Sequence, residues 1–158
     1  MRVFLIALIL LGLAQCGPVA SPATNLVAQN AEAPAARLAL LSSELNGARQ
    51  SNGRAPLKFN QRLQAAAQAH ADDMARRGFF SHVSPDGRDL RDRLAGAGYR
   101  FCFAAENIAQ GQSTAAEVMG AWMNSAGHRR NNLSREAREF GAARAPGNTW
   151  VLVFGAPC

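Results

Sequence analysis

Lysine is nearly absent from this chain. Of its 17 basic residues, sixteen are arginine and only Lys58 is lysine, against 11 acidic residues. Arginine suits bidentate pairing with carboxylate or phosphate groups. The basic residues are scattered, and the only adjacent pairs are Arg76-Arg77 and Arg129-Arg130. We therefore predict a generally cationic surface that favours anionic partners, and no nucleic-acid partner.

Long apolar runs and internal repeats are also missing. The apolar run from Val3 to Leu13 is too short to span a bilayer. It follows Arg2 and precedes small residues, which is typical of a secretory signal. Leu13-Ala14-Gln15-Cys16 resembles a bacterial lipobox, in which Cys16 becomes the lipidated first residue. Because Gln15 departs from the usual small residue, simple cleavage near residues 20–23 and a retained anchor stay open.

The predicted organisation follows from these segments. Residues 1–16 form the signal peptide, residues 17–34 a flexible linker rich in Ala, Pro, Asn and Ser, and residues 35–158 the folded domain. The sequence thus indicates a secreted or periplasmic protein, whose contact with a membrane is limited to a lipid anchor at Cys16.

Cysteine is scarce as well, with three residues in the chain. If Cys16 is lipidated or removed, Cys102 and Cys158 remain as a pair. An oxidising envelope permits a disulfide between them. Closing so long a loop would stabilise the fold by roughly 3–4 kcal/mol in the entropic description. The alternative is two free thiols.

Helix and strand signals are mixed along the domain without a repeating βαβ rhythm, which indicates an α+β fold. Asn60 and Thr114 are predicted N-caps, and Glu117 completes a capping box with Thr114. Gly78 is predicted to end the second helix. Helices are expected at residues 35–50, 61–77, 89–97 and 115–124, and strands at residues 99–104, 139–144 and 150–154.

An ordered set of short motifs resembles the bacterial secreted branch of the CAP superfamily (SCP domain), which includes cysteine-rich secretory, antigen 5 and pathogenesis-related proteins. The motifs are Leu45-Asn46-x-x-Arg49, Pro56-Leu57, Asp73-Met74, Ser81-His82, Gly98-Tyr99, Ala105-Glu106-Asn107-Ile108, Ala121-Trp122, Ser125-x-x-His128-Arg129-x-Asn131 and Trp150-x-x-x-Phe154-Gly155. The resemblance implies an α-β-α sandwich with a central antiparallel sheet flanked by helices. It also implies a cleft where polar residues meet.

Three residues match the cleft residues of that superfamily, namely His82, Glu106 and His128. Two imidazoles and a carboxylate form a recognised zinc set with one open position. Such a trio suits Zn²⁺ better than calcium, which prefers more oxygen ligands. Many relatives carry a second acid where this chain has Ser125, so we expect a three-residue metal site. The alternative is a hydrogen-bonded network that organises the fold.

The other polar residues near these motifs have structural interpretations. Asn107 is predicted to hold a loop or turn beside the cleft through its amide. His70 is predicted to be a core histidine, and Trp122 a core residue. Ser81 and Ser125 are weak candidates for a nucleophile, because the chain has no Gly-x-Ser-x-Gly elbow.

Two functions therefore remain in view. The first is an exported binding or scaffold protein of the bacterial envelope, whose cleft holds a divalent cation or a small ligand. Its partners would be an envelope glycan, a lipid or a protein, with anionic groups favoured. The alternative is a metal-dependent hydrolase of peptide or cell-wall bonds, with Glu106 as third ligand or general base.

Overall fold

The computed structural model describes the backbone of residues 23–158 and the side chains of residues 36–158. This part contains five helices and four strands: α1 (Ala23–Ser51), β1 (Lys58–Phe59), α2 (Gln61–Arg77), α3 (Leu90–Gly96), β2 (Phe103–Gln110), α4 (Ala115–Asn124), α5 (Ala126–Asn132), β3 (Glu139–Ala145) and β4 (Thr149–Ala156). The predicted signal peptide and Cys16 lie outside the described residues.

The strands form one sheet in the order β1-β3-β4-β2. β4 pairs antiparallel with both β2 and β3, whereas β1 is parallel to β3. The resemblance implied a wholly antiparallel sheet, but the parallel pair of β1 and β3 makes the sheet mixed. β2 lies at an edge of the sheet. Carbonyl groups on its free side accept hydrogen bonds from side chains of α4 and α5, namely Trp122 and Asn131.

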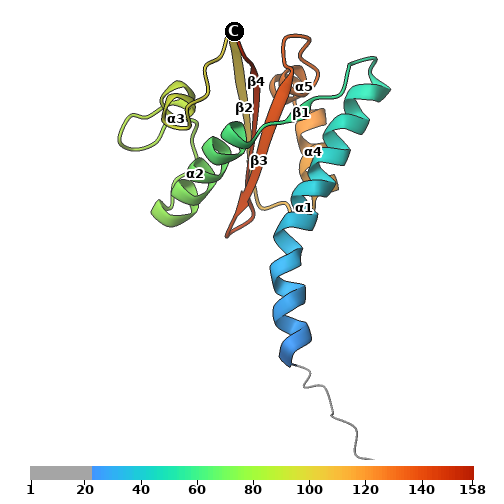
Figure 1. Ribbon diagram of the computed structural model, residues 1–158, viewed down its shortest axis with the longest axis vertical. Helices are drawn as coiled ribbons and strands as arrows, with labels where there is room; N and C mark the ends of the chain where they lie inside the picture. Colours follow the sequence, from blue (N-terminus) through green and yellow to red (C-terminus); the bar gives the residue numbers. More distant parts are fainter. Residues whose placement is uncertain (1–22) are drawn as a thin grey trace, which may run out of the picture.

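Helices cover both faces of this sheet, as the resemblance implied. α2 and α3 lie on one face, and α1, α4 and α5 lie on the other (Figure 1). Each face has its own apolar cluster. Leu63, Met74, Leu94 and Val153 are buried under α2 and α3, while Leu45, Trp122, Trp150 and Leu152 are buried under α1 and α4. The α+β sandwich prediction is confirmed.

α2 begins and ends where the local signals predict. The Asn60 side chain accepts a hydrogen bond from the Arg62 backbone N–H at 2.9 Å, and Gly78 follows the helix in a left-handed conformation with φ 68°. The helix lies very close to β3. A Cβ atom on Gly141 would come within 2.1 Å of the Gln64 backbone nitrogen, so only glycine fits there.

The disulfide predicted between Cys102 and Cys158 is present, with a Cα–Cα distance of 4.8 Å. Beside it, the Cys102 backbone N–H donates to the Ala156 carbonyl at 2.9 Å. The bridge therefore ties the last residue of the chain to the start of β2.

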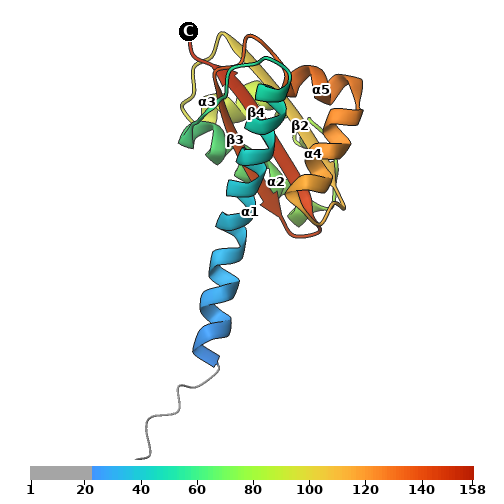
Figure 2. The ribbon, with the colours of Figure 1, turned by 90° about the vertical axis from the view of Figure 1, so that its right-hand side faces the viewer.

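Four elements differ from the predictions. β1 was not predicted, β2 covers Phe103–Gln110 rather than residues 99–104, and α5 was not predicted. Gly127 lies in the first turn of α5. α1 begins at Ala23, so residues 23–34 are helical rather than an irregular linker, and this half of α1 projects from the body (Figures 1 and 2). Within residues 23–158, no helix is long and apolar enough to cross a membrane.

Candidate functional site

The carboxylate of Glu106 is the centre of the polar site. β2 directs it toward the α2 and α3 face, where its side chain is 3% exposed. Its Oε1 accepts a hydrogen bond from His82 Nδ1 at 2.8 Å, and its Oε2 accepts one from Arg93 Nη2 at 2.8 Å. His70 Nε2 lies 3.8 Å from Oε1. Both carboxylate oxygens therefore have cationic or N–H partners from the protein itself.

Arg93 holds this carboxylate and the loop that carries His82 at the same time. It comes from α3, whose N-terminus Asp89 caps in a reciprocal capping box with Asp92. Both Nη1 and Nη2 donate to the His82 carbonyl oxygen at 3.1 Å. The Arg93 side chain is 4% exposed, so the ion pair with Glu106 is buried. A buried pair of this kind fixes geometry, because neither charge can be left without the other.

The charges of the site follow from burial and from these bonds. Burial raises the pKa of Glu106, but the hydrogen bond from His82 and the charge of Arg93 outweigh it and hold the pKa below its ordinary value. Burial lowers the pKa of His70, and this effect exceeds the opposing charge of Glu106. At neutral pH, Glu106 is thus a carboxylate and His70 a neutral imidazole.

His70 joins α2 to the loop that leads to His82. Its ring lies in the core, 1% exposed, and its Nε2 is 3.0 Å from the Ser81 carbonyl oxygen. Since a carbonyl oxygen can only accept, Nε2 carries the proton of the neutral ring. Its Nδ1 is buried without a hydrogen-bond partner among the described residues. The predicted core histidine is therefore in the core, directly behind the site.

The orientation of His82 determines what the site can do. Because Glu106 is a carboxylate and can only accept, His82 Nδ1 carries a proton. In the neutral ring, Nε2 then has a free lone pair. The His82 side chain is 55% exposed, and within residues 36–158 no hydrogen bond engages Nε2. This nitrogen is consequently able to take a proton, a metal ion or a ligand hydrogen.

Asn107 points to the opposite face of the sheet, because successive strand residues alternate. Its side chain is fully buried, and its Nδ2 donates to the His128 carbonyl oxygen at 3.1 Å and to Asn132 Oδ1 at 2.9 Å. Asn131 Nδ2 donates back to Asn107 Oδ1 at 2.8 Å and to the Glu106 carbonyl oxygen at 3.3 Å. Asn107 therefore holds a helix, α5, rather than a loop, and α5 carries His128.

His128 is half-buried at this edge of the sheet. Burial lowers its pKa, and the charge of His82 lowers it further. Within the described part of the chain, no three His, Cys, Asp or Glu side chains gather as a metal-ligand group. Glu106 is bonded to the inner nitrogen of His82, Nδ1, and does not lie next to the outer nitrogen, where a metal ion would bind. Zinc binding stays a prediction.

The remaining candidates lie around the site without entering its hydrogen bonds. Ser125 lies at the junction of α4 and α5, and its hydroxyl makes no helix-cap bond. The Ser81 hydroxyl accepts from the Val83 backbone N–H at 3.2 Å. Trp122 is 1% exposed and donates to the Ile108 carbonyl oxygen at 3.2 Å, as a core residue. Glu117 Oε2 accepts from the Ser113 backbone N–H at 2.8 Å, at the start of α4.

The sequence motifs include Asn131, but Arg93 and Asn132 were missed as parts of this network. Arg93 lies in a short helix with three other charged or polar neighbours, and arginine in such a helix is usually on the surface. The signal that could have identified it is the spacing of Leu90 and Leu94, which marks one side of α3 as apolar and places Arg93 beside it.

Comparisons with known proteins agree with this fold. Residues 43–154 match the family model described as the cysteine-rich secretory protein family, CAP. The uncharacterized protein YkwD of Bacillus subtilis is 37% identical over 110 residues, which is 69% of this chain and 43% of that protein. The uncharacterized membrane protein YlbC of the same organism is 34% identical over 96 residues, 61% of this chain and 28% of that protein. The chain thus spans less than half the length of these two relatives.

Solved structures share the architecture. An extracellular protein containing an SCP domain from Bacillus anthracis superposes with a TM-score of 0.74 and 26% identity, over 88% of this chain and 44% of that one. An outer surface protein from Borrelia burgdorferi superposes with a TM-score of 0.71 and 21% identity, over 77% of this chain and 93% of that one. At that identity, the second likeness shows the fold alone.

Proposed function

Because the chain belongs to the CAP family of cysteine-rich secretory proteins, we propose that it is an exported binding protein of the bacterial envelope. Its ligand site is the edge of β2, where His82 and His128 lie on either side of the strand. The extracellular location of the Bacillus anthracis relative supports export of this chain. So does the disulfide, which requires an oxidising compartment.

One contact carries this proposal, namely the bond from His82 Nδ1 to Glu106 Oε1. A carboxylate behind a histidine fixes the ring and its tautomer, and it makes the outer nitrogen a better donor to a metal ion. Glu106 is therefore proposed as the support of a ligand and not as a ligand. His82 Nε2 and an imidazole nitrogen of His128 would hold a divalent cation, with Zn²⁺ the best match.

A cation held this way would bind weakly and keep open positions. Two protein ligands are fewer than the three of a typical catalytic zinc site. The open positions would accept oxygen atoms of a small polar ligand. Weak, exchangeable binding of this kind suits a protein that captures a ligand better than one that needs a permanent metal.

The same contact favours hydrolysis as the second candidate. A histidine oriented by a carboxylate can act as a general base toward water. Glu106 itself is unsuited to that role, because it is buried and its Oε2 is bonded to Arg93. If the chain is a hydrolase, the base is thus His82, with Glu106 as the residue that positions it.

A zinc titration followed by thermal unfolding tests the binding proposal. A cation that binds only the native state raises the apparent stability by about 2.7 kcal/mol at a hundred times its dissociation constant. We expect this rise in the wild type and its loss in the double variant His82→Ala, His128→Ala. The matched control is the double variant Arg91→Ala, Arg100→Ala, two exposed residues that make no bond to His82, Glu106 or His128, and it should keep the zinc response. An equal response in the double variant, or none in the wild type, would contradict the proposed cation site.

A further inference from the structure

Two sets of basic residues at the surface differ in their partners. Near the end of α2, Arg76, Arg77 and Arg88 form ion pairs with Asp73 and Asp86. Within residues 36–158, no ion pair includes a second set of basic residues, which we call the basic end: Arg54, Lys58, Arg129, Arg130, Arg135 and Arg138.

Two adjoining hollows run through the basic end. One, of about 680 Å³, is lined by Arg54, Lys58, Arg135 and Arg138. The other, of about 600 Å³, is lined by Arg54, Arg129, Arg130 and Arg135. Because Arg54 and Arg135 line both, the two hollows adjoin, and we call them together the groove. The groove extends from the start of β1 to α5 and includes residues from segments distant in the sequence.

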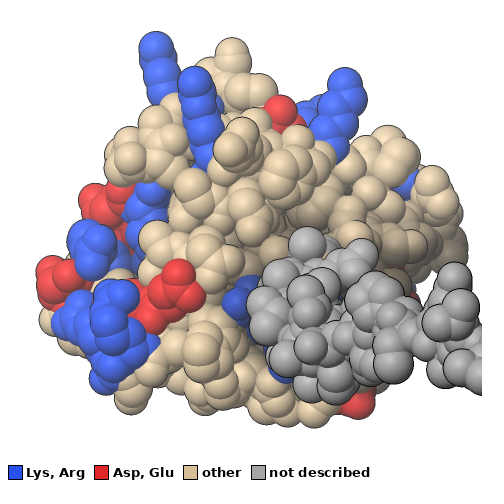
Figure 3. Space-filling model, turned by 60° about the horizontal axis from the view of Figure 1, so that its bottom comes forward, with Lys and Arg blue, Asp and Glu red and all other residues tan. Residues whose placement is uncertain are grey.

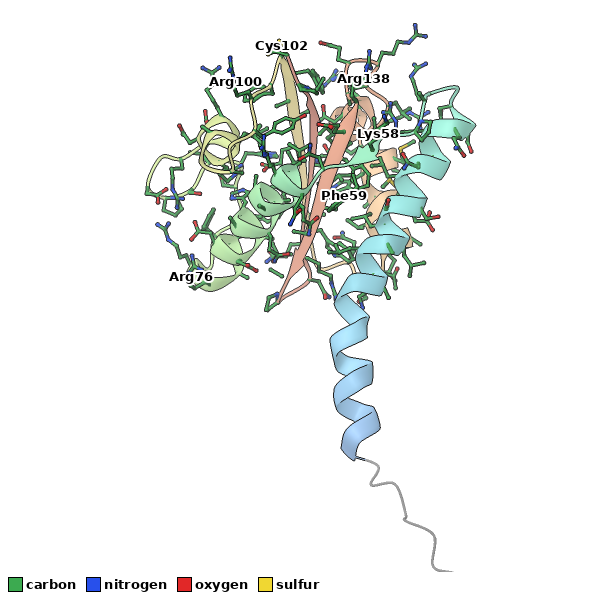
Figure 4. All side chains as sticks on the ribbon, in the orientation of Figure 1. Lys58, Phe59, Arg76, Arg100, Cys102 and Arg138 are labelled. Atoms are coloured by element: carbon green, nitrogen blue, oxygen red, sulfur yellow. A yellow bond between two sulfur atoms is a disulfide. The ribbon has the colours of Figure 1, made fainter. Side chains whose placement is uncertain are left out.

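The groove lies away from the projecting half of α1. Figure 4 shows Lys58 and Arg138 in the upper part of the body, away from the half of α1 that projects below it. The side seen in Figure 3 differs, because there the basic side chains at the left edge are mixed with acidic ones and most of the surface is uncharged. If the N-terminal side of α1 leads toward the membrane, the groove faces the opposite way.

Little negative charge offsets the basic end. Glu139 lines one hollow, but its Oε2 accepts from Tyr99 Oη at 2.7 Å and from Asn60 Nδ2 at 3.0 Å. Glu136 lines the other hollow as its single carboxylate. Beneath them, burial and the charges of Arg54 and Arg138 lower the pKa of Arg49. Arg49 is thus surrounded by positive charge that the protein leaves largely uncompensated.

We propose that this groove binds a linear polyanion whose phosphate or carboxylate groups repeat along an extended backbone. Arg54, Arg129 and Arg138 each use one guanidinium nitrogen in hydrogen bonds within the protein. Their other N–H groups, together with those of Arg130 and Arg135, can donate to either group. Two joined hollows suit several repeats better than a single anion. An anionic glycan of the bacterial envelope is a polymer of this kind.

The lining residues favour a polymer over a membrane or a nucleic acid. The exposed large apolar residues of the described chain are Leu40, Phe59, Phe80 and Val83, and none of them lines the groove. A surface that inserts into lipid needs such residues. The bases of single-stranded nucleic acids stack on aromatic side chains. Phe103 is the only aromatic residue among the lining residues of the two hollows.

The test compares two triple variants of equal charge. The groove variant is Lys58→Gln, Arg135→Gln, Arg138→Gln, three exposed residues. The control variant is Arg76→Gln, Arg88→Gln, Arg91→Gln, also exposed and outside the groove. Circular dichroism and the thermal midpoint establish that each is folded. Binding of the purified protein to inorganic polyphosphate and to polygalacturonate is measured over a series of salt concentrations.

We expect the wild type to bind at least one of the two polymers, with an affinity that falls steeply as salt rises. The groove variant should bind about tenfold or more weakly and with a shallower salt dependence, while the control changes less than about twofold. Binding to polyphosphate but not to polygalacturonate would identify phosphate as the recognised group. Binding to polygalacturonate but not to polyphosphate would identify carboxylate. Equal losses in both triple variants would overturn the groove, since net charge would then explain the binding.

Two further probes distinguish the other sources of anionic groups. Vesicles of phosphatidylglycerol and a single-stranded oligonucleotide are measured beside the polymers. Tighter binding to either one than to both polymers overturns the proposal, and so does the absence of polymer binding at low salt. The zinc response of the groove variant separates this result from that of the cleft. It should equal the wild-type response, because Lys58, Arg135 and Arg138 make no hydrogen bond to His82 or His128.

Discussion

The buried pair of Glu106 and Arg93 allows a prediction in which the size of the effect follows from the structure. Glu106→Gln keeps the shape of the side chain and removes its charge. Arg93, whose side chain is 4% exposed, then has no counter-charge. Breaking a buried pair by neutralising one partner costs about 3–5 kcal/mol. For a chain of this size, the midpoint of thermal unfolding should fall by roughly 10 °C.

The double-mutant cycle shows whether this cost comes from the pair. Arg93→Met removes the other charge and leaves Glu106 its bond from His82. The double variant has no buried charge from the pair, so it should be more stable than the sum of the single losses by about 1–3 kcal/mol. Urea unfolding at neutral pH measures all four proteins.

An exposed carboxylate provides the control for the cycle. Asp86→Asn removes the partner of Arg88 at the surface, and we expect almost no change in the free energy of unfolding. A loss below about 1 kcal/mol for Glu106→Gln, or losses that simply add in the double variant, would refute the reasoning that Arg93 depends on Glu106.

Three further predictions concern packing, pH and the disulfide. Gly141→Ala should prevent stable folding, because its Cβ would lie 2.1 Å from the backbone of α2. Gly120→Ala, in an open position on α4, should stabilise by about 0.5–1 kcal/mol, and thermal unfolding of both variants shows the contrast. Since burial lowers the pKa of His70 from its ordinary 6.5, the unfolded chain takes up a proton that the native chain does not. Stability should therefore fall as the pH drops below about 6.5, and His70→Gln should flatten that fall in urea unfolding measured across the range; an unchanged slope would contradict it. Replacing Cys102 and Cys158 by Ser should cost about 3–4 kcal/mol, and a reductant should destabilise only the wild type.

Local signals in the sequence predicted α2 and α4 well. Asn60 and Gly78 act at the backbone of α2 itself, and Thr114 accepts from the Glu117 backbone N–H at 3.2 Å. Such contacts join residues a few positions apart, so they can be inferred from the order of residues alone.

β2 and α5 escaped prediction because their stability comes from distant residues. Glu106 and Asn107 are poor strand formers, and they are tolerated in β2 since each has buried partners on its own face of the sheet. α5 is a short helix with a glycine in its first turn. Its position depends on the bonds between Asn107, Asn131 and the His128 carbonyl, which no pattern of nearby residues indicates.

The family motifs identified His82, Glu106 and His128, but not their relation to one another. Residue type left two interpretations open, a metal site of three ligands and a hydrogen-bonded network. The structure instead separates their positions, with Glu106 buried behind His82 and His128 on a helix at the other side of β2. The cause is Arg93, which occupies the second carboxylate oxygen from a helix whose sequence resembles an ordinary surface helix.

The protonated nitrogen of His82 tests the central claim most directly. Long-range proton–nitrogen NMR correlations of the labelled protein, recorded where the ring is neutral, distinguish the two tautomers. We predict that the proton is on Nδ1 and that Nε2 is the nitrogen whose resonance shifts when zinc is added. In Glu106→Gln, the preference for Nδ1 should weaken, because an amide can also donate. A proton on Nε2 in the wild type would contradict a site in which Glu106 holds His82 with its outer nitrogen free.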